Sequence, residues 1–468
     1  MSEGTRSHWG SKAGFVLAAA GSAVGLGNLW KFPYITGENG GGAFVLVYLA
    51  CILLVGVPIM VGEVFVGKLA QKGPVGAFGD LTPRGSPWKL VGALGVVTGF
   101  VILSYYSVVA GWAMHYVLLA ARGTFSGADT PEEIAAIGAH FGALYADPTL
   151  NVLWHVAFMA ITIAIVIAGV QKGVERAGRV LMPALLVVLA ALAAYAATLS
   201  GFGRAVSFVF GLHTEDLTGA GVLEALGHSF FTLSLGMGAM ITYGSYLRRE
   251  DGVVATSFVI SGLDTGVALL ACLALFPITF TYGMEPAAGP GLVFVNMPTA
   301  FAQMPGGSVW ATLFFVLLTF AALTSAVSLL EVVASYFIDE LGWSRPRAVA
   351  VLGVAILLFG IPSALSGGTE LFGSGFSTAI AGALGQERGK NWFDGLDYLA
   401  SNWMLPLGGL GLALFAGWRL DDVKRRAALS EGGTFGRIVP LYLGWLWLLR
   451  IVAPIAIVLV MLHAIGLL

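Results

Sequence analysis

The chain has 468 residues, of which 57% are hydrophobic and 11% are charged, and its mean hydropathy is +0.86. Soluble globular domains carry about 25% charged residues. The composition therefore excludes a soluble globular protein and indicates an integral membrane protein. The formal net charge of −2 says nothing about partners, because the charged residues are sorted by position along the chain.

Eleven apolar segments are long enough to cross a bilayer, which takes about 20 mainly apolar residues in a helix. We therefore expect an all-α membrane protein with eleven transmembrane helices. The expected spans are residues 12–37, 42–70, 88–121, 149–170, 174–199, 222–247, 253–283, 306–338, 345–366, 392–418 and 436–466.

The positions of lysine and arginine predict the orientation. With the N-terminus in the cytoplasm, eighteen of the 24 basic residues fall at cytoplasmic span ends or loops and four in outer loops, while Lys31 and Arg450 lie within spans. Lysine and arginine are enriched in cytoplasmic loops. We therefore expect a multi-pass protein of the cell membrane (a bacterial inner or plasma membrane), with its N-terminus in the cytoplasm and its C-terminus outside.

Residues 21–33 interrupt the first span. They place Gly21, Gly25 and Gly27 in its interior and continue with an amide, a lysine and a proline. Each interior glycine costs a helix about 1 kcal/mol relative to alanine, and an unpaired backbone group in lipid costs several kcal/mol more. Such a break persists only where the freed N–H and C=O groups bind something else. Taken alone, the segment is also compatible with a merely kinked helix.

A second break, at residues 230–238, lies five spans after the first. Glycines and hydroxyl residues interrupt that span in its middle, and the helix pattern resumes at Ala239. Two broken helices at matching positions of two five-span halves indicate an inverted-repeat secondary transporter with its site near the bilayer midplane. We expect a single transporter domain over residues 1–468, with repeats at about 12–199 and 222–418 and an extra helix at about 436–466.

The two breaks carry motifs of a known family. Residues 25–33 (Gly-Leu-Gly-Asn-Leu-Trp-Lys-Phe-Pro) and 38–44 (Glu-Asn-Gly-Gly-Gly-Ala-Phe) resemble the first-helix signature of the neurotransmitter:sodium symporter family. Residues 230–236 (Phe-Phe-Thr-Leu-Ser-Leu-Gly) are similar to its sixth-helix motif, and residues 242–246 and 323–325 resemble further family motifs. The resemblance covers most of the first eight spans and is weaker toward the C-terminal end.

The resemblance implies a LeuT-type fold, in which the first five helices and the next five form an inverted repeat and the first and sixth are discontinuous. It also implies Na⁺-coupled uptake of a small amino-bearing substrate. Larger members of the family have twelve spans, whereas some bacterial members end after eleven, as this chain does.

The first break offers binding groups for both an anion and a cation. A half-helix that starts near Gly27 directs its N–H groups and positive dipole end into the midplane, which favours a carboxylate. The carbonyls freed before it are hard oxygen ligands for an alkali cation. The resemblance implies two sodium ions, the first also bound by the substrate carboxylate. The first sodium would use Ala23, Asn28, Thr232 and Asp264, and the second Gly21, Val24, Ala321, Thr324 and Ser325.

Gly25 narrows the substrate class. Family members that carry monoamines have an aspartate at this position, so the glycine favours an α-amino acid. By resemblance, Tyr106 binds its carboxylate, whereas Phe231, Thr232 and Ser234 receive its ammonium group. No charged residue lines the side-chain pocket, so we expect a hydrophobic or aromatic L-amino acid. The full predicted substrate site is Ala23, Gly25, Leu26, Gly27, Ile102, Tyr106, Phe231, Thr232, Ser234, Met237, Ser325 and Leu329.

Asp264 is an ionisable residue inside the seventh span, where an unpaired charge is costly and a functional role is the default hypothesis. In chloride-dependent family members a neutral residue stands here, and a bound chloride supplies the charge. The resemblance therefore implies chloride-independent transport. His228 precedes Thr232 by one helical turn on the same side, which leaves a proton counterflux open. The alternative is that Asp264 merely caps a neighbouring helix.

Two basic–acidic pairs resemble the gates of the family: Lys31 with Asp397 on the outer side, and Arg6 with Asp339 on the cytoplasmic side. The family more often has arginine in place of Lys31. A lysine cannot form a bidentate fork with a carboxylate, which predicts a looser outer gate. Glu63, in the second span, is interpreted as a structural carboxylate that satisfies freed backbone groups of the broken helices.

The sequence thus favours a sodium-coupled amino acid symporter. The alternatives are a transporter of another small zwitterionic substrate, a non-transporting amino acid sensor on the same fold, and a channel. The sequence presents no nucleophile–base constellation or metal-ligand cluster, so we do not expect an enzyme. The expected partners are the amino acid, Na⁺ and the lipid bilayer, without nucleic acid. The preferred amino acid, the number of ions per cycle and the oligomeric state stay open.

Overall fold

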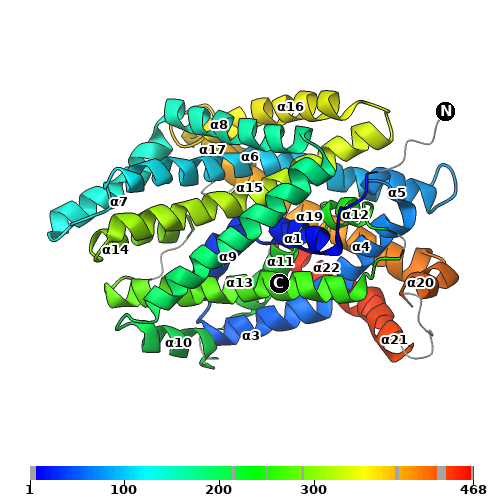
Figure 1. Cartoon of the computed structure of the whole chain (residues 1–468), viewed down its shortest axis with the longest axis horizontal. Helices are drawn as coiled ribbons and strands as arrows, with labels where there is room; N and C mark the ends of the chain where they lie inside the picture. The colour runs from blue at the N-terminus through cyan, green and yellow to red at the C-terminus, as the bar shows by residue number, and fades with distance from the viewer. Residues whose placement is uncertain are drawn as a thin grey trace.

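The computed structural model describes residues 7–212, 214, 217–248, 250–285, 289–384, 389–429, 439–464 and 467. Every regular element in these ranges is a helix, and the longest of them run roughly along one axis of the molecule (Figure 1). The prediction of an all-α membrane protein is confirmed.

The helices labelled α and the π-helical segments labelled η are α1 (Lys12–Ala23), η1 (Gly27–Lys31), α2 (Phe32–Glu38), α3 (Gly42–Cys51), η2 (Ile52–Gly56), α4 (Val57–Ala70), α5 (Pro74–Asp80), α6 (Lys89–Ala121), α7 (Pro131–Ala146), α8 (Pro148–Ile167), η3 (Val170–Glu175), α9 (Arg176–Ala196), α10 (Phe202–Phe210), α11 (Gly219–Thr232), α12 (Ala239–Gly244), α13 (Val254–Thr281), η4 (Leu292–Asn296), α14 (Met297–Ala302), α15 (Gly307–Asp339), α16 (Arg345–Leu365), α17 (Ser374–Leu384), α18 (Trp392–Leu399), η5 (Ala400–Met404), α19 (Leu405–Leu414), η6 (Phe415–Arg419), α20 (Asp422–Leu429), α21 (Val439–Trp447), η8 (Leu448–Val452) and α22 (Ala453–Ala464).

Nine helical runs among the described residues are long and apolar enough to cross a membrane, and a tenth is formed if α1 and η1–α2 count as one span bent by 50°. The remaining expected span consists of α11 and α12, which have 14 and 6 residues and are separated by turns at residues 233–238. Neither half is long enough alone. The two discontinuous helices therefore lie where the sequence predicts them, while the count of eleven spans stays a prediction.

Most of the π-helical segments within the spans have a proline as their cause. A proline lacks the N–H that the carbonyl four residues earlier would accept, and its ring clashes with that carbonyl. Pro33 and Pro58 thus take away the N–H that the Leu29 and Leu54 carbonyls would accept. In the turn just before each proline, carbonyls bond to the N–H five residues on, as Gly27 does with Phe32 and Ile52 does with Val57. A proline stands two residues after each of the segments η1, η2, η4, η5 and η8, namely Pro33, Pro58, Pro298, Pro406 and Pro454.

The broken helix α1 lies in the middle of the bundle, packed against α9, α13 and α15 (Figure 1). α15 also packs along α6, α8 and α16. Glycines permit the closest approaches between helices, because a side chain in their place would clash with the neighbouring helix. A Cβ added to Gly178 of α9 would lie 2.9 Å from the Cα of Ala18 in α1, and a Cβ added to Gly67 of α4 would lie 1.9 Å from the Ile241 carbonyl oxygen of α12. The packing thus holds both broken helices against long, unbroken ones.

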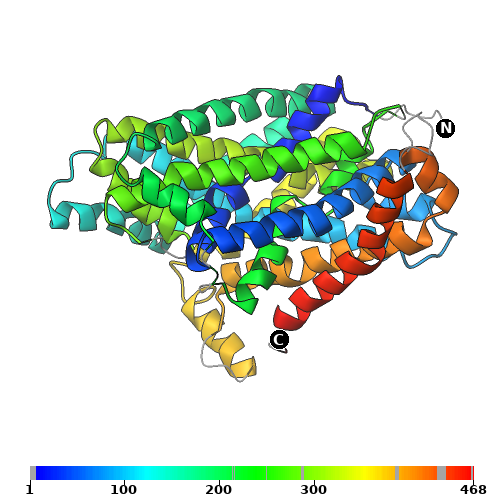
Figure 2. The same ribbon diagram turned by 90° about the horizontal axis from the view of Figure 1, so that it is seen from below.

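Two peripheral elements stand away from this core. Viewed from below, the yellow-orange helix α17 projects from the bundle (Figure 2). The C-terminal run α21–η8–α22, in red, packs along α19 and α11.

Arg450, an arginine inside the last span, caps the end of the preceding span. Its Nε donates to the Gly417 carbonyl at 2.7 Å, and Arg425 Nη1 donates to the carbonyls of Ala416 and Gly417 at 3.0 and 2.9 Å. The last carbonyls of a helix have no partner within it. The two guanidinium groups therefore satisfy the end of η6, and the Arg450 side chain faces protein.

Candidate functional site

The first break redirects backbone hydrogen bonds away from the helix. In a continuous helix the N–H groups of Gly25 and Leu26 would bond to the carbonyls four residues earlier. Instead, Gly25 N donates to Asn28 Oδ1 at 3.0 Å, and Leu26 N donates to the Tyr106 hydroxyl at 3.2 Å. The carbonyls of Gly21 and Ser22 are thereby freed. Tyr106, predicted to bind the substrate carboxylate, thus lies at the start of the outer half-helix.

The carbonyl of Ser22 receives two hydroxyl groups from other helices. Ser234 Oγ donates to it at 2.8 Å and Ser325 Oγ at 3.1 Å, and a longer contact of 3.5 Å joins Ser325 Oγ to the Gly21 carbonyl. Ser22 is absent from the site predicted from the sequence. Its position between Gly21 and Ala23, both predicted ligands, is the signal that could have identified it.

The second break is held in a strained backbone conformation. Ser234 has φ +53°, and Gly236 and Gly238 have φ +81° and +77°. Glycine adopts these values at little cost, whereas a residue with a Cβ does so rarely. The freed N–H of Gly236 donates to Glu63 Oε1 at 2.7 Å. The interpretation of Glu63 as a carboxylate that satisfies backbone groups of a broken helix is confirmed.

A cavity of about 30 Å³ lies between the two breaks. All twelve residues of the predicted substrate site line it, joined by Ser22. The surroundings of Gly25 leave no room for a side chain, because a Cβ added at this residue would lie 2.5 Å from Ser325 Oγ and 3.0 Å from the Tyr106 hydroxyl. The backbone at residue 25 thus forms the cavity wall, where an aspartate side chain would not fit without displacing both hydroxyls.

Three residues predicted for the first sodium are in direct contact. Asn28 Nδ2 donates to Asp264 Oδ1 at 2.7 Å and to the Asp264 carbonyl at 3.0 Å, and Thr232 Oγ1 donates to both carboxylate oxygens at 3.1 Å. Asp264 is fully buried. The fourth predicted ligand, Ala23, lines the adjoining cavity. This cluster offers an amide, a hydroxyl and a carboxylate oxygen, which are hard ligands.

The residues predicted for the second sodium gather between α1 and α15. Ser325 reaches the Gly21 carbonyl as described above, a Cβ on Gly21 would lie 3.1 Å from Thr324 Cβ, and Thr324 Oγ1 donates to the Ala321 carbonyl at 3.0 Å. Val24 caps α1, with its N–H on the Ala20 carbonyl. The cluster therefore combines the end of one broken helix with a hydroxyl-bearing turn of an unbroken one.

His228 is buried, and neither of its ring nitrogens has a hydrogen-bond partner among the described residues. The ring stacks on Phe32 with a centroid distance of 5.8 Å and lies at the same distance from Tyr48. The possibility of a proton shared with Asp264 thus receives no support from a direct hydrogen bond.

The predicted outer gate residues border one cavity without pairing. Lys31 and Asp397 both line a space of about 220 Å³ above the first break. Within the described residues, no ion pair joins them: Lys31 Nζ lies 5.0 Å from the centre of the Phe231 ring, and Asp397 accepts hydrogen bonds from Tyr105 at 3.0 Å and Ser401 at 3.2 Å. The predicted role of Lys31 and Asp397 as the outer gate stays a prediction: both groups face one cavity, and each contacts other side chains in this structure.

The inner gate is described in part. Arg6 lies outside the described residues, so its predicted pairing with Asp339 has no structural counterpart here. Asp339 Oδ2 accepts the Gly73 N–H at 2.7 Å. Trp9 is buried, and its indole Nε1 donates to the Tyr243 carbonyl at 3.0 Å. The segment before α1 is thus anchored to α12, the inner half of the second broken helix.

Sequence reasoning also missed Glu175, at the end of η3. Its Oε2 accepts the Gly10 N–H at 2.8 Å, and its Oε1 pairs with Arg179 Nη2 at 2.5 Å. Arg179 Nη2 in turn donates to Ser11 Oγ at 2.7 Å. A glutamate next to two basic residues gives no signal in the sequence. Its partner is a backbone N–H more than 160 positions away.

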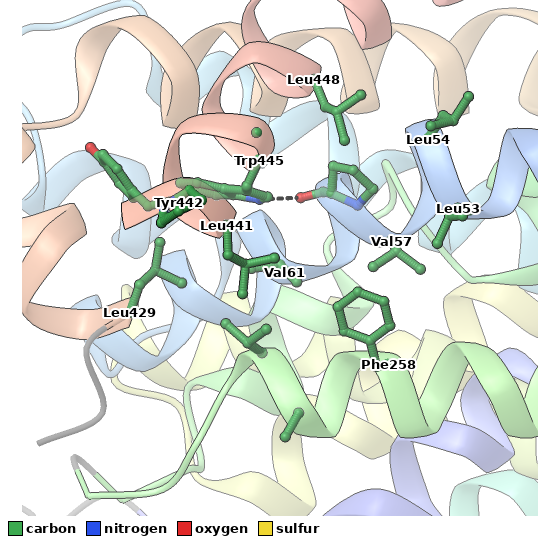
Figure 3. A pocket seen from close by; sticks show the side chains of 15 residues that line it. Leu53, Leu54, Val57, Val61, Phe258, Leu429, Leu441, Tyr442, Trp445 and Leu448 are labelled. Carbon is green, nitrogen blue, oxygen red and sulfur yellow. Dashed lines mark hydrogen bonds between the residues drawn. The ribbon is translucent and has the colours of Figure 1, made fainter. Parts of the chain in front are cut away.

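A wider apolar groove of about 680 Å³ lies on the flank of the bundle, apart from the breaks (Figure 3). It runs between η2–α4, α13 and α21, and is lined by side chains such as Leu53, Phe258 and Leu441. Its floor includes a hydrogen bond from Trp445 Nε1 to the Pro58 carbonyl at 3.0 Å. None of the predicted site residues borders this groove, and its described lining contains no Asp, Glu, Lys, Arg or His.

Two broken helices that meet around a buried cavity, beside a cluster of hard oxygen ligands, are the arrangement of an ion-coupled secondary transporter. The chain belongs to the sodium:neurotransmitter symporter family, whose model matches residues 6–128 and 147–378. It is therefore a sodium-dependent, multi-pass membrane transporter and not an enzyme.

Individual relatives agree with this assignment. The chain is 38% identical to an uncharacterized sodium-dependent transporter, YhdH, of Bacillus subtilis, with all of both chains covered, and 32% identical to one of Haemophilus influenzae, with 97% of each chain covered. Among solved structures it is similar to MhsT in complex with L-phenylalanine, with 45% identity, a TM-score of 0.86, and 98% and 100% of the two chains covered. The predicted LeuT-type fold is confirmed.

Proposed function

We propose that this protein imports a hydrophobic or aromatic L-amino acid together with Na⁺ by alternating access. The observation that carries the proposal is the cavity between the two breaks, lined by all twelve residues predicted for the substrate. One end of it lies at the start of the outer half-helix, beside Gly27 and the Tyr106 hydroxyl, where the positive end of a helix dipole suits a carboxylate. The wall around Ile102, Met237 and Leu329 is apolar, which suits an uncharged side chain.

Gly25 supports an α-amino acid over a monoamine. A monoamine needs a protein carboxylate to balance its ammonium group, and the space around residue 25 does not admit one. An amino acid brings its own carboxylate. The relative MhsT, at 45% identity, has been solved with L-phenylalanine, which supports the choice of an aromatic substrate.

Two sodium ions accompany the substrate in this proposal. The first is bound by Ala23, Asn28, Thr232, Asp264 and the substrate carboxylate, so that ion and amino acid raise each other's affinity. The second is bound by Gly21, Val24, Ala321, Thr324 and Ser325. Asp264 supplies a fixed negative charge at the first ion, and transport is therefore independent of chloride. The N-terminus faces the cytoplasm, as the distribution of basic residues indicates.

Uptake by reconstituted vesicles tests the proposal. Purified protein in liposomes should concentrate radiolabelled L-phenylalanine when an inward Na⁺ gradient is imposed, and should do so equally in chloride and in gluconate. Replacement of outer Na⁺ by K⁺ should abolish accumulation. Sodium-dependent binding without accumulation would identify a sensor, and accumulation of glycine betaine or another zwitterion in place of hydrophobic amino acids would overturn the substrate class.

A further inference from the structure

The carbonyl of Ser22 is a shared acceptor for two functional hydroxyls. It is free because Leu26 N, its partner in a continuous helix, donates to Tyr106. Ser234 Oγ, from the second break, and Ser325 Oγ, from α15, occupy it together at 2.8 and 3.1 Å. One of these hydroxyls lies in the proposed ammonium site, and the other in the proposed second sodium site.

A shared acceptor fixes the orientation of both hydroxyls. A serine hydroxyl has one hydrogen and two lone pairs. When the hydrogen points to the Ser22 carbonyl, the lone pairs are left to face the ligand. For Ser234 that ligand is an ammonium group, and for Ser325 it is a cation, both of which need lone pairs. A hydroxyl without this acceptor can rotate and present its hydrogen instead.

The backbone of Ser234 makes its dependence on Ser22 stronger. Its φ of +53° lies in the left-handed region, which is unfavourable for a residue with a Cβ. Such a conformation persists only when surrounding contacts determine it. The hydrogen bond to Ser22 joins this strained residue to the other broken helix, and it is therefore a contact on which the position of Ser234 depends.

Ser328 holds Ser22 in place from outside the cavity. Ser22 Oγ donates to Ser328 Oγ at 2.7 Å, and Ser328 Oγ donates to the Ser325 carbonyl at 2.7 Å. Both serines are 1% exposed. Ser328 does not line the cavity. It ties the end of α1 to the same turn of α15 that carries Thr324 and Ser325.

We propose that Ser22 and Ser328 form a positioning pair that couples the amino acid site to the second sodium site. A sodium ion that orders Ser325 also orders the Ser22 carbonyl, and the Ser22 carbonyl orders Ser234 for the ammonium group. The inference rests on the proposed function. The positioning pair adds to the proposed function a physical link between ion and substrate that does not pass through the substrate carboxylate.

The test compares Ser328→Ala with wild-type protein in equilibrium binding of radiolabelled L-phenylalanine at limiting and at saturating Na⁺. The Kd at limiting Na⁺ divided by the Kd at saturating Na⁺ measures the coupling between ion and substrate. We expect this ratio to fall about fivefold or more in Ser328→Ala, since coupling energies of this kind correspond to about 5–150-fold. Ser328→Thr, which keeps a hydroxyl, should restore it. Ser257→Ala is the matched control, because this buried serine bonds to the Val253 carbonyl of its own helix at 2.9 Å.

Ser22→Ala removes the other half of the same bond and should give the same loss, which keeps the test decisive if one variant fails to fold. An unchanged ratio in folded Ser328→Ala or Ser22→Ala overturns the inference, as does an equal loss of affinity at both Na⁺ concentrations. A wild-type protein whose binding does not depend on Na⁺ overturns the proposed function itself, before any variant is compared.

Discussion

Gly14 and Glu175 lie so close that a Cβ at residue 14 would be 1.9 Å from Glu175 Oε1. The carboxylate fills the space that a side chain would need, and its other oxygen accepts the Gly10 N–H. The segment before α1 therefore docks on η3 through a glycine-lined contact.

Gly14→Ala should loosen the contact between the start of α1 and Glu175 of η3. The added methyl group displaces the Glu175 carboxylate and removes its bond to Gly10, a loss of about 1.5–3 kcal/mol for a hydrogen bond to a charged group. Hydrogen–deuterium exchange of residues 8–14 and 170–175 should rise. Glu175→Ala should have the same effect, and adding Gly14→Ala to it should change little more.

The control for this pair is Gly262→Ala, whose Cβ would have no heavy atom within 4 Å. Its exchange should match that of the wild type. Unchanged exchange in Gly14→Ala would contradict the prediction, since the clash cannot be relieved without moving the carboxylate.

Gly25→Ala should weaken L-phenylalanine binding about fivefold or more, because the new Cβ would lie 2.5 Å from Ser325 Oγ and an overpacked site costs about 1–3 kcal/mol. Equilibrium binding at saturating Na⁺ measures the effect. Gly227→Ala is the control, because its added Cβ would lie 3.8 Å from the nearest atom, and it should bind L-phenylalanine normally. Equal affinity in both variants would show that residue 25 does not border the ligand.

Asp264→Asn should make transport depend on chloride. Breaking a buried charge pair by removing one partner costs about 3–5 kcal/mol, so uptake in gluconate should fall at least about tenfold. Added chloride should restore part of it by supplying the missing charge. Asp129→Asn, at an exposed position outside the membrane spans, should leave uptake unchanged. A variant with full activity in gluconate would remove Asp264 from the first sodium site.

Lys31→Gln should speed release of bound L-phenylalanine about two- to fivefold, because a cation over an aromatic face contributes about 0.5–1 kcal/mol at a solvated site. The ammonium group sits 5.0 Å from the Phe231 ring centre, above the cavity. Lys390→Gln is a close control, since Lys390 lies at the same distance from the Tyr398 ring. Dissociation rates after dilution into unlabelled ligand measure the difference, and equal rates in both variants would refute a role for Lys31 as a lid.

Arg450→Met should lower thermal stability without changing the affinity for substrate. It removes the bond from the charged guanidinium to the Gly417 carbonyl, which contributes about 1.5–3 kcal/mol, although Arg425 still donates to that carbonyl. The melting temperature of the purified protein in detergent measures the loss. Arg419→Met, at an exposed position of η6, should melt like the wild type. A loss of binding at unchanged stability would contradict a purely structural role.

The sequence by itself determined the fold class, both breaks and the residues around the cavity. These features depend on local chemistry: apolar length defines a span, and interior glycines break it. The π-helical segments could not have been predicted this way, because Pro183, Pro277 and Pro362 stand in spans that stay α-helical, and η3 and η6 form without a following proline. The twelve residues of the predicted substrate site came from motif resemblance, and the structure brings all of them to one cavity.

Only the tertiary structure decided which partner each freed or charged group takes. Ser22 emerged as a shared acceptor because Ser234 and Ser325 come from helices far along the chain. Lys31 lies over Phe231 and not against Asp397, because the nearest partner of a long side chain depends on the distance between helices. Glu175 reaches Gly10 for the same reason. Such pairings arise from packing, and no local pattern encodes them.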